Sequence, residues 1–170
     1  MLGFNMFFAG FALFLGGVSY FVPFNRKALG LINFFAAGFM VINTSVGLLF
    51  ANGEMGNYAN AAAAFGFALN FLILGVHHFK ELTDFRLFGW FSLLMSLTSI
   101  VFLVQAIVLG LPWLLIYLWA MWAVLWGQAF LASGLQIKSV DKASPYLVIG
   151  NSVLSLIAPA LLLLLGVIVL

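Results

Sequence analysis

Three tryptophans stand close together in the segment LWAMWAVLW, which runs from Leu118 to Trp126. At 100° per residue on a helix, Trp119 and Trp126 point in almost the same direction, and Trp122 lies about 60° away. The indoles would therefore form a stripe on one face that climbs about 10 Å along the axis. Such a stripe could narrow a lumen and offer flat faces to planar molecules. Packing between helices is the alternative interpretation.

The other hydrogen-bonding side chains inside apolar segments are amides and hydroxyls. They are Asn5, Asn33, Asn43, Thr44, Ser45, Asn70, Ser92, Ser96, Gln105, Gln128, Asn151, Ser152 and Ser155. Hydrogen bonds between helices are the usual role of such residues, but an amide facing a lumen could donate to and accept from a neutral solute. Because pumps and coupled transporters usually hold an ionisable group inside the membrane, passive conduction of a neutral solute is the simpler hypothesis.

The remaining residues form no catalytic or metal-binding pattern. His77 and His78 are adjacent, so their side chains diverge by 100° on a helix, and no third ligand is evident. We expect the pair to end a helix near the membrane interface. The chain contains no cysteine, no Gly-rich phosphate loop and no nucleophile–base pair. We therefore expect neither an enzyme nor a bound cofactor or metal.

The elements that must position these residues are membrane-spanning helices. The 170 residues are 66% hydrophobic and only 6% charged, whereas a soluble domain has about 25% charged residues. Such a chain cannot present a water-facing surface on all sides, so we expect an integral membrane protein. A net charge of +2 from so few groups implies no nucleic-acid partner. No basic segment precedes the first apolar run, so we expect a retained span rather than a signal peptide.

Six apolar segments are long enough to cross about 30 Å of hydrocarbon. We expect the spans at Leu2–Val22, Ala28–Ala51, Tyr58–Phe79, Leu87–Leu109, Pro112–Leu135 and Tyr146–Leu170. The short connections leave no room for a second domain, so residues 1–170 should form a single transmembrane domain whose charged residues all lie in connections. Every Lys and Arg falls in the first, third or fifth connection. The positive-inside rule then predicts that these connections are cytoplasmic and that both termini lie outside.

Residue spacing indicates an internal repeat. An interval of 59 residues separates Asn33 from Ser92, Ser92 from Asn151, Lys27 from Arg86, and Gly30 from Gly89. We therefore predict an all-α integral membrane protein whose six transmembrane helices form three repeated two-helix hairpins around a pore in each protomer. A packed, closed centre is equally compatible with the pattern.

Five motifs spread over most of the chain carry a resemblance to a known family. They are MLGF (1–4), INFFAAGF (32–39), FGFALNF (65–71), DFRLFGWFSL (84–93) and WAMWAVLWGQAF (119–130). With these motifs the chain resembles the bacterial urea/amide channels of the AmiS/UreI family, which are encoded beside ureases and aliphatic amidases. The family includes the acid-gated urea channel of gastric bacteria. The last motif is the most specific, because its tryptophan spacing and trailing Ala-Phe recur in the family.

The resemblance implies a homo-oligomeric ring, a hexamer, in the lipid of the bacterial inner membrane, with one pore in each protomer. It also implies that urea or short aliphatic amides cross passively, in functional linkage with a cytoplasmic urease or amidase. The family's pore positions fall here on Leu2, Met6, Ala9, Leu13, Phe67, Phe71, Leu115, Trp119, Trp122, Leu125, Trp126 and Asn151. Apolar and aromatic walls with few polar groups suit a slit that orients its solute.

Two departures distinguish this chain from the acid-gated urea channel. Asn151 stands where that channel has a glutamate, so the hydrogen-bonding group is uncharged here. The connections NGEMGN and GLP are also too short, and too poor in histidine and acidic residues, for a pH-titrating lid. We therefore expect an ungated channel, with urea and short amides both retained as substrates. A coupled transporter of a small neutral metabolite and a non-transporting membrane protein are the alternative hypotheses.

Overall fold

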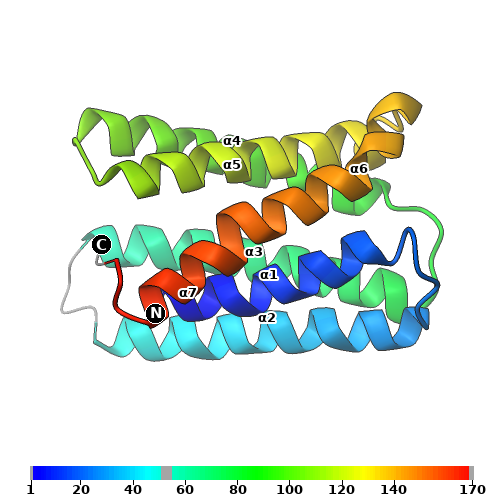
Figure 1. The fold of residues 1–170 in the computed structure, drawn as a ribbon, viewed down its shortest axis with the longest axis horizontal. Coiled ribbons are helices and arrows are strands. Elements are labelled where there is room, and N and C mark those ends of the chain that lie inside the picture. Colours follow the sequence, from blue (N-terminus) through cyan, green and yellow to red (C-terminus); the bar gives the residue numbers. More distant parts are fainter. Residues whose placement is uncertain (1, 51–54, 169–170) are drawn as a thin grey trace.

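The protein is an all-helical bundle drawn out along one axis (Figure 1). The computed structural model describes residues 2–50 and 55–168. The elements are α1 Leu2–Val18, α2 Arg26–Leu49, α3 Met55–Phe79, α4 Arg86–Val108, α5 Trp113–Ala129, the π-helical segment η1 Phe130–Gly134, α6 Lys138–Asn151, the π-helical segment η2 Ser152–Ile157, and α7 Ala158–Leu164. Since η1 continues α5, and η2 joins α6 to α7, the described chain forms six helical rods.

Five of the six rods are long and apolar enough to cross a membrane. They are Arg26–Leu49, Asn60–Phe79, Arg86–Val108, Trp113–Gly134 and Lys138–Leu164. The remaining rod, α1, is apolar but has 17 residues. It therefore extends about 26 Å, slightly less than the hydrocarbon core. The predicted all-α class with six helices is confirmed, and five of the six described rods reach the length of a membrane span.

The first predicted span was too long at its C-terminal end. It was expected to reach Val22, but α1 ends at Val18. The following turn is closed by backbone hydrogen bonds such as Phe21 N to Val18 O, at 2.9 Å. Pro23 then has no N–H with which to continue a helix. The side chain of Asn25 begins the next helix, because its Oδ1 accepts from the N–H groups of Lys27 and Ala28.

The last predicted span was wrong at both ends. It was expected to start at Tyr146, but α6 begins at Lys138, so charged residues assigned to a connection form two turns of helix. Charge marks where a segment leaves the hydrocarbon, and a helix can continue into water beyond that point. At the other end α7 stops at Leu164, before Gly166, whose positive φ of 69° ends the helix. The final two residues of the predicted span, 169 and 170, lie outside the described residues.

The prediction that every charged residue lies in a connection was also wrong. Arg26 and Lys27 begin α2, and Arg86 begins α4. Within α6 lie Lys138, Asp141 and Lys142. The first turns of these helices are charged because they extend beyond the apolar core of the sequence.

The rods form a closed ring in chain order. Each rod packs on the rod before it and the rod after it, and the last rod packs on the first through α1 against α6, η2 and α7. The most extensive contacts are those of α2 with α3, of α4 with α5, and of α1 with the last rod. The three hairpins are therefore connected by turns but pack mainly against their neighbours. A ring of this kind can hold a space at its centre.

Glycines make the closest approaches between neighbouring hairpins. A Cβ on Gly30 would lie 2.7 Å from the backbone N of Phe79, and one on Gly89 would lie 2.1 Å from that of Gly134. A Cβ on Gly17 would lie 2.6 Å from a side-chain atom of α6. These contacts join α2 to α3, α4 to η1, and α1 to α6. The repeat of Gly30 and Gly89 therefore has a packing cause.

The two ends of the bundle differ in charge. Three turns, residues 19–25, 80–85 and 135–137, lie together at the right of Figure 1, and we call this the basic end. All the Lys and Arg residues lie in these turns or in the first two helical turns beside them. Both labelled termini and the turn 109–112 lie at the opposite end, which we call the terminal end.

Candidate solute pathway

A cavity of about 430 Å³ lies at the centre of the ring, with wall residues from all six rods. It begins at the terminal end, where the exposed Leu109 and Leu111 belong to its wall, and therefore opens there. Its deepest wall residues include Leu13 and Trp126. From Leu2 to Leu13 the helical rise gives a depth of about 16 Å. No residue of the turns at the basic end contributes to the wall of this cavity, within residues 2–50 and 55–168.

Eleven of the twelve pore positions implied by the family resemblance lie in the wall of this cavity. They are Leu2, Met6, Ala9, Leu13, Phe67, Phe71, Leu115, Trp119, Trp122, Leu125 and Trp126. These residues come from α1, α3 and α5 and lie up to 124 positions apart in the chain. The ring brings them to one space.

Asn151, the twelfth position, does not line the central cavity. Its side chain is buried, with Nδ2 donating to the backbone oxygen of Met121 at 2.8 Å and Oδ1 accepting from the hydroxyl of Ser155. Its repeat equivalents behave similarly, because Asn33 Nδ2 donates to Leu29 O and Ser92 Oγ donates to a carbonyl one turn earlier. The recurring polar residue therefore hydrogen-bonds to a helix carbonyl in each repeat. Asn151 borders a smaller cleft of about 190 Å³ between the last two rods.

The tryptophan stripe forms an aromatic cluster around Phe67. The Phe67 ring centroid lies 5.3 Å from that of Trp122 and 5.6 Å from that of Trp126, with the Trp126 ring stacked at 28°. Trp119 meets Trp122 edge-on at 5.0 Å and stacks on Phe102 at 4.6 Å. The same rings line the cavity. The tryptophans of the stripe therefore pack against rings of other helices and also border the cavity, so the structure does not separate the two interpretations.

Three side chains in this part of the ring carry buried polar atoms that lack a partner. Among the described residues, the indole Nε1 atoms of Trp122 and Trp126 and both amide atoms of Asn70 make no hydrogen bond. Asn70 is fully buried on α3, next to Phe71 in the chain. A buried polar group without a partner costs about 1–3 kcal/mol. Such groups call for an explanation, and a functional role is one of the common ones.

The amide and hydroxyl residues of the wall gather near the terminal end. They are Asn5, Thr44, Asn60 and Gln105. Asn5 Nδ2 donates to Thr44 Oγ1 at 3.1 Å, and Asn43 Nδ2 donates to Asn5 Oδ1 at 2.8 Å. The cavity therefore has a neutral polar mouth and an aromatic interior.

Sequence reasoning assigned none of these four residues to the pathway. A usable signal existed on α3, where Asn60, Ala64, Phe67 and Phe71 follow the helical spacing i, i+4, i+7, i+11. Extending the two predicted phenylalanines backwards along that face leads to Asn60. Phe102 on α4, which stacks on Trp119, had no comparable signal because α4 is apolar on every side.

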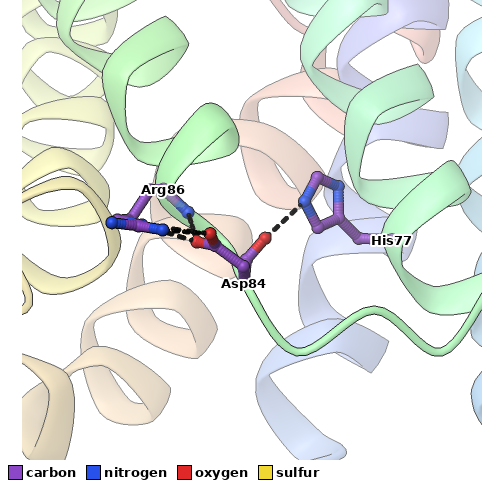
Figure 2. A network of polar contacts seen from close by, with 3 residues as sticks. All are labelled: His77, Asp84 and Arg86. Atoms are coloured by element: carbon purple, nitrogen blue, oxygen red, sulfur yellow. Dashed lines mark hydrogen bonds and ion pairs between the residues drawn. The ribbon is translucent and has the colours of Figure 1, made fainter.

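The histidine pair ends α3 at the basic end and does not belong to the cavity wall. Figure 2 shows His77 facing Asp84 in the turn that follows α3. The Nδ1 of His77 lies 2.8 Å from Ile73 O, and its Nε2 lies 2.8 Å from Asp84 O, so the ring ties the end of α3 to the following turn. Arg86 donates two hydrogen bonds from Nε and one from Nη2 to the carboxylate of Asp84 and holds the pKa of that carboxyl down at about 2. The described residues contain no group of three metal-binding side chains. The expected helix-ending role of His77 agrees with these contacts.

Among the described residues, membrane-length helices close around a cavity with an uncharged wall, which is the architecture of a multi-pass membrane protein of the channel or transporter class. The chain belongs to the AmiS/UreI family of transporters, whose family model matches residues 1–167. The family is one of transporters and not of enzymes.

Curated relatives and solved structures agree with this assignment. A relative from Mycolicibacterium smegmatis, named as a transporter of amidate substrates, is 24% identical over 98% of this chain and 78% of its own length. The transporter protein AmiS2 of Rhodococcus erythropolis is 22% identical over 95% of this chain and 78% of its own length. The crystal structure of the Helicobacter pylori urea channel superposes with a TM-score of 0.83 and 25% identity, covering 99% of this chain and 100% of that one. The closed state of that channel gives a TM-score of 0.84 at 24% identity, with the same coverage.

Proposed function

We propose that the protein is a passive channel for urea or short aliphatic amides and that it is not acid-gated. The observation that carries the proposal is the wall of the central cavity, which contains no charged side chain among the described residues. An ion entering such a space would lose its hydration without a compensating charge. A neutral amide loses only hydrogen bonds to water, several kcal/mol in total, and polar wall groups can replace part of them.

The order of wall residues supports a passage that binds its solute weakly. Near the terminal end the neutral polar residues can exchange hydrogen bonds with an amide as it leaves water. Deeper in the ring, Phe67 and the tryptophans present flat faces and indole N–H groups. Conduction requires binding that is favourable enough for the solute to enter and weak enough for it to leave. A few neutral hydrogen bonds and aromatic contacts meet both conditions.

The direct test is permeation in liposomes that contain the purified protein. Stopped-flow light scattering should show that urea and acetamide cross these liposomes much faster than protein-free liposomes of the same lipid. A membrane potential set with a potassium gradient and valinomycin should drive neither protons nor sodium into the same liposomes. Permeation of neither amide above the protein-free rate would contradict the proposal.

A coupled transporter of a small neutral metabolite is the second candidate. It is favoured by the extent of the cavity, whose wall stops short of the basic end, as in a carrier open to one side. The absence of an ionisable wall residue among those described counts against it. Uphill accumulation of acetamide driven by a proton or sodium gradient would establish coupling. Equilibration without accumulation is the result expected of a channel.

The assembly and orientation belong to the same proposal. We infer a hexameric ring in the bacterial inner membrane, both termini outside, serving a cytoplasmic urease or amidase. Support for the orientation comes from the basic end, which gathers all the Lys and Arg residues and should face the cytoplasm. Exposed apolar side chains such as Phe35, Leu94 and Val101 support contact with lipid or with other copies. Because the chain has no cysteine, a Lys142→Cys variant can be labelled selectively, and labelling from the cytoplasmic side alone would support this orientation.

A further inference from the structure

Two buried polar side chains face each other in the wall of the cavity near its mouth. Asn5 on α1 is 8% exposed and Thr44 on α2 is 5% exposed, and both belong to the cavity wall. They lie one turn inside the rim formed by Leu2 and Leu48. A solute that enters from the terminal end therefore meets this pair before it reaches Phe67 and the tryptophans.

The hydrogen bonds within this pair leave a defined set of groups unused. Asn5 Nδ2 has two hydrogens and gives one to Thr44 Oγ1, while Asn5 Oδ1 has two lone pairs and accepts one bond, from Asn43. The Thr44 hydroxyl accepts from Asn5, and within the described residues its own hydrogen has no acceptor. One N–H of Asn5, one O–H of Thr44 and one lone pair of Asn5 Oδ1 are therefore available.

This set is complementary to a primary amide. Such a group needs donors for its carbonyl oxygen and an acceptor for one of its N–H groups, and the pair supplies all of these within one small patch. The bond from Asn43 fixes the orientation of the Asn5 amide, which places its donor toward Thr44 and its acceptor toward Asn43. Preorganised partners lose little conformational entropy when a ligand binds.

We propose that Asn5 and Thr44 form an amide-recognition site at the mouth of the cavity, which binds the CO–NH₂ group of the solute and selects for primary amides and urea. The inference rests on the proposed function, because it assigns the selectivity of the same pathway. The carbonyl oxygen accepts from the Thr44 hydroxyl and the Asn5 amide, and a solute N–H donates to Asn5 Oδ1. Asn60 and Gln105, from α3 and α4, complete the polar wall.

The first test measures permeation through variants of this site. Thr44→Val keeps the shape of the side chain and removes the hydroxyl, so urea and acetamide permeability should fall by about five- to tenfold, the effect of one or two lost hydrogen bonds. Thr44→Ser should restore most of it. Thr98→Val is the matched control, because the Thr98 hydroxyl bonds to Leu94 O on α4, outside the cavity wall. Wild-type permeability in Thr44→Val, or an equal loss in Thr98→Val, would overturn the proposal.

The second test measures binding without transport. Saturation-transfer NMR on detergent-solubilised protein should detect acetamide bound to the wild type and to Thr98→Val, but much less bound to Asn5→Leu and Thr44→Val. If the wild type binds acetamide through this site and yet liposomes show no permeation, the proposed channel function fails while the recognition site stands. If the wild type binds no acetamide, or the variants bind it equally well, the recognition site is wrong.

Discussion

The two halves of the ring are built from the same six rods but differ in content. The half near the terminal end encloses the cavity, with uncharged polar residues at the mouth and aromatic rings inside. The half near the basic end is closed by packing and by bonds such as Ser144 Oγ to Gln128 Oε1 at 2.7 Å. The Lys and Arg residues lie in its turns or in the first two helical turns beside them. A helix can thus present a cavity-facing surface in one half and a structural contact in the other. The expected effect of a substitution therefore depends on whether the residue lies in the half near the terminal end or in the half near the basic end.

The largest effect is expected at Gly89, where α4 approaches η1 in the closed half. A Gly89→Ala side chain would meet backbone atoms of Gly134 at 2.1 Å, so the rods would have to separate. The loss of stability should exceed the roughly 1–3 kcal/mol typical of overpacking, and folded protein should be nearly absent in fluorescence-detected size-exclusion chromatography. Gly38→Ala is the control, since a Cβ there meets no atom within 4 Å. A normal yield of Gly89→Ala would contradict the packing role of this half.

The next largest effect is expected at Trp126, in the wall of the cavity. Trp126→Ala removes a ring stacked on Phe67 and widens the aromatic interior, so solute permeability or selectivity should change in liposomes while the assembled protein survives in detergent. Trp90→Phe is the control, because Trp90 is half exposed on α4 and contacts Phe130 outside the cavity. A pure core role for Trp126 would instead cost about 3–5 kcal/mol and mainly lower the folded yield. If the Ala variants of all three stripe tryptophans keep wild-type flux and selectivity, the tryptophans do not line the solute pathway.

A smaller and different effect is expected at Asn151, which the family resemblance placed in the pathway. The structure ties this amide to the backbone of Met121 and to Ser155. Asn151→Ala should therefore lower the free energy of unfolding by about 0.5–1.5 kcal/mol, the usual contribution of one lost hydrogen bond, because the Met121 carbonyl lies within α5. The ratio of urea to acetamide permeability should stay unchanged. A changed ratio with unchanged stability would return Asn151 to the pathway.

The smallest effect is expected from pH. The titratable side chains that the structure places lie at the basic end, with the exceptions of Tyr58 and Tyr117. Glu54, the acidic residue of the connection NGEMGN that was expected to face outward, lies outside the described residues. The pKa of Asp84 is lowered from 3.8 to about 2, so the stability from its pairing with Arg86 is present above about pH 4 and is lost only as pH falls toward 2. Urea flux should therefore vary by no more than about twofold between external pH 5 and 8. A steep rise on acidification, abolished by Glu54→Gln, would overturn the ungated assignment.

The sequence predicted the number and approximate positions of the helical rods, and it predicted part of the cavity wall. Both successes have identifiable physical reasons. Length and apolarity define membrane spans, and helical spacing aligns Phe67 with Phe71 and the tryptophans with one another. Amphipathicity does not predict which face of a helix points into the ring, because both the surrounding lipid and the interior of the ring accept apolar side chains. The positions of Asn5 and Thr44 in the wall, and of Asn151 outside it, depend on how neighbouring rods approach. That approach is set by glycine contacts such as Gly30 against Phe79, which local spacing does not encode.

Obstruction of the cavity tests the central claim most directly, and the chain suits the experiment because it has no cysteine. Ala64→Cys places a thiol in the cavity wall, and Phe50→Cys places one at the exposed end of α2 outside the wall. Modification with a methanethiosulfonate reagent, confirmed by mass spectrometry, should reduce urea permeability of the Ala64→Cys liposomes to the protein-free rate and leave that of Phe50→Cys unchanged. Unchanged urea permeability after complete modification of Ala64→Cys would show that the solute does not cross through this cavity.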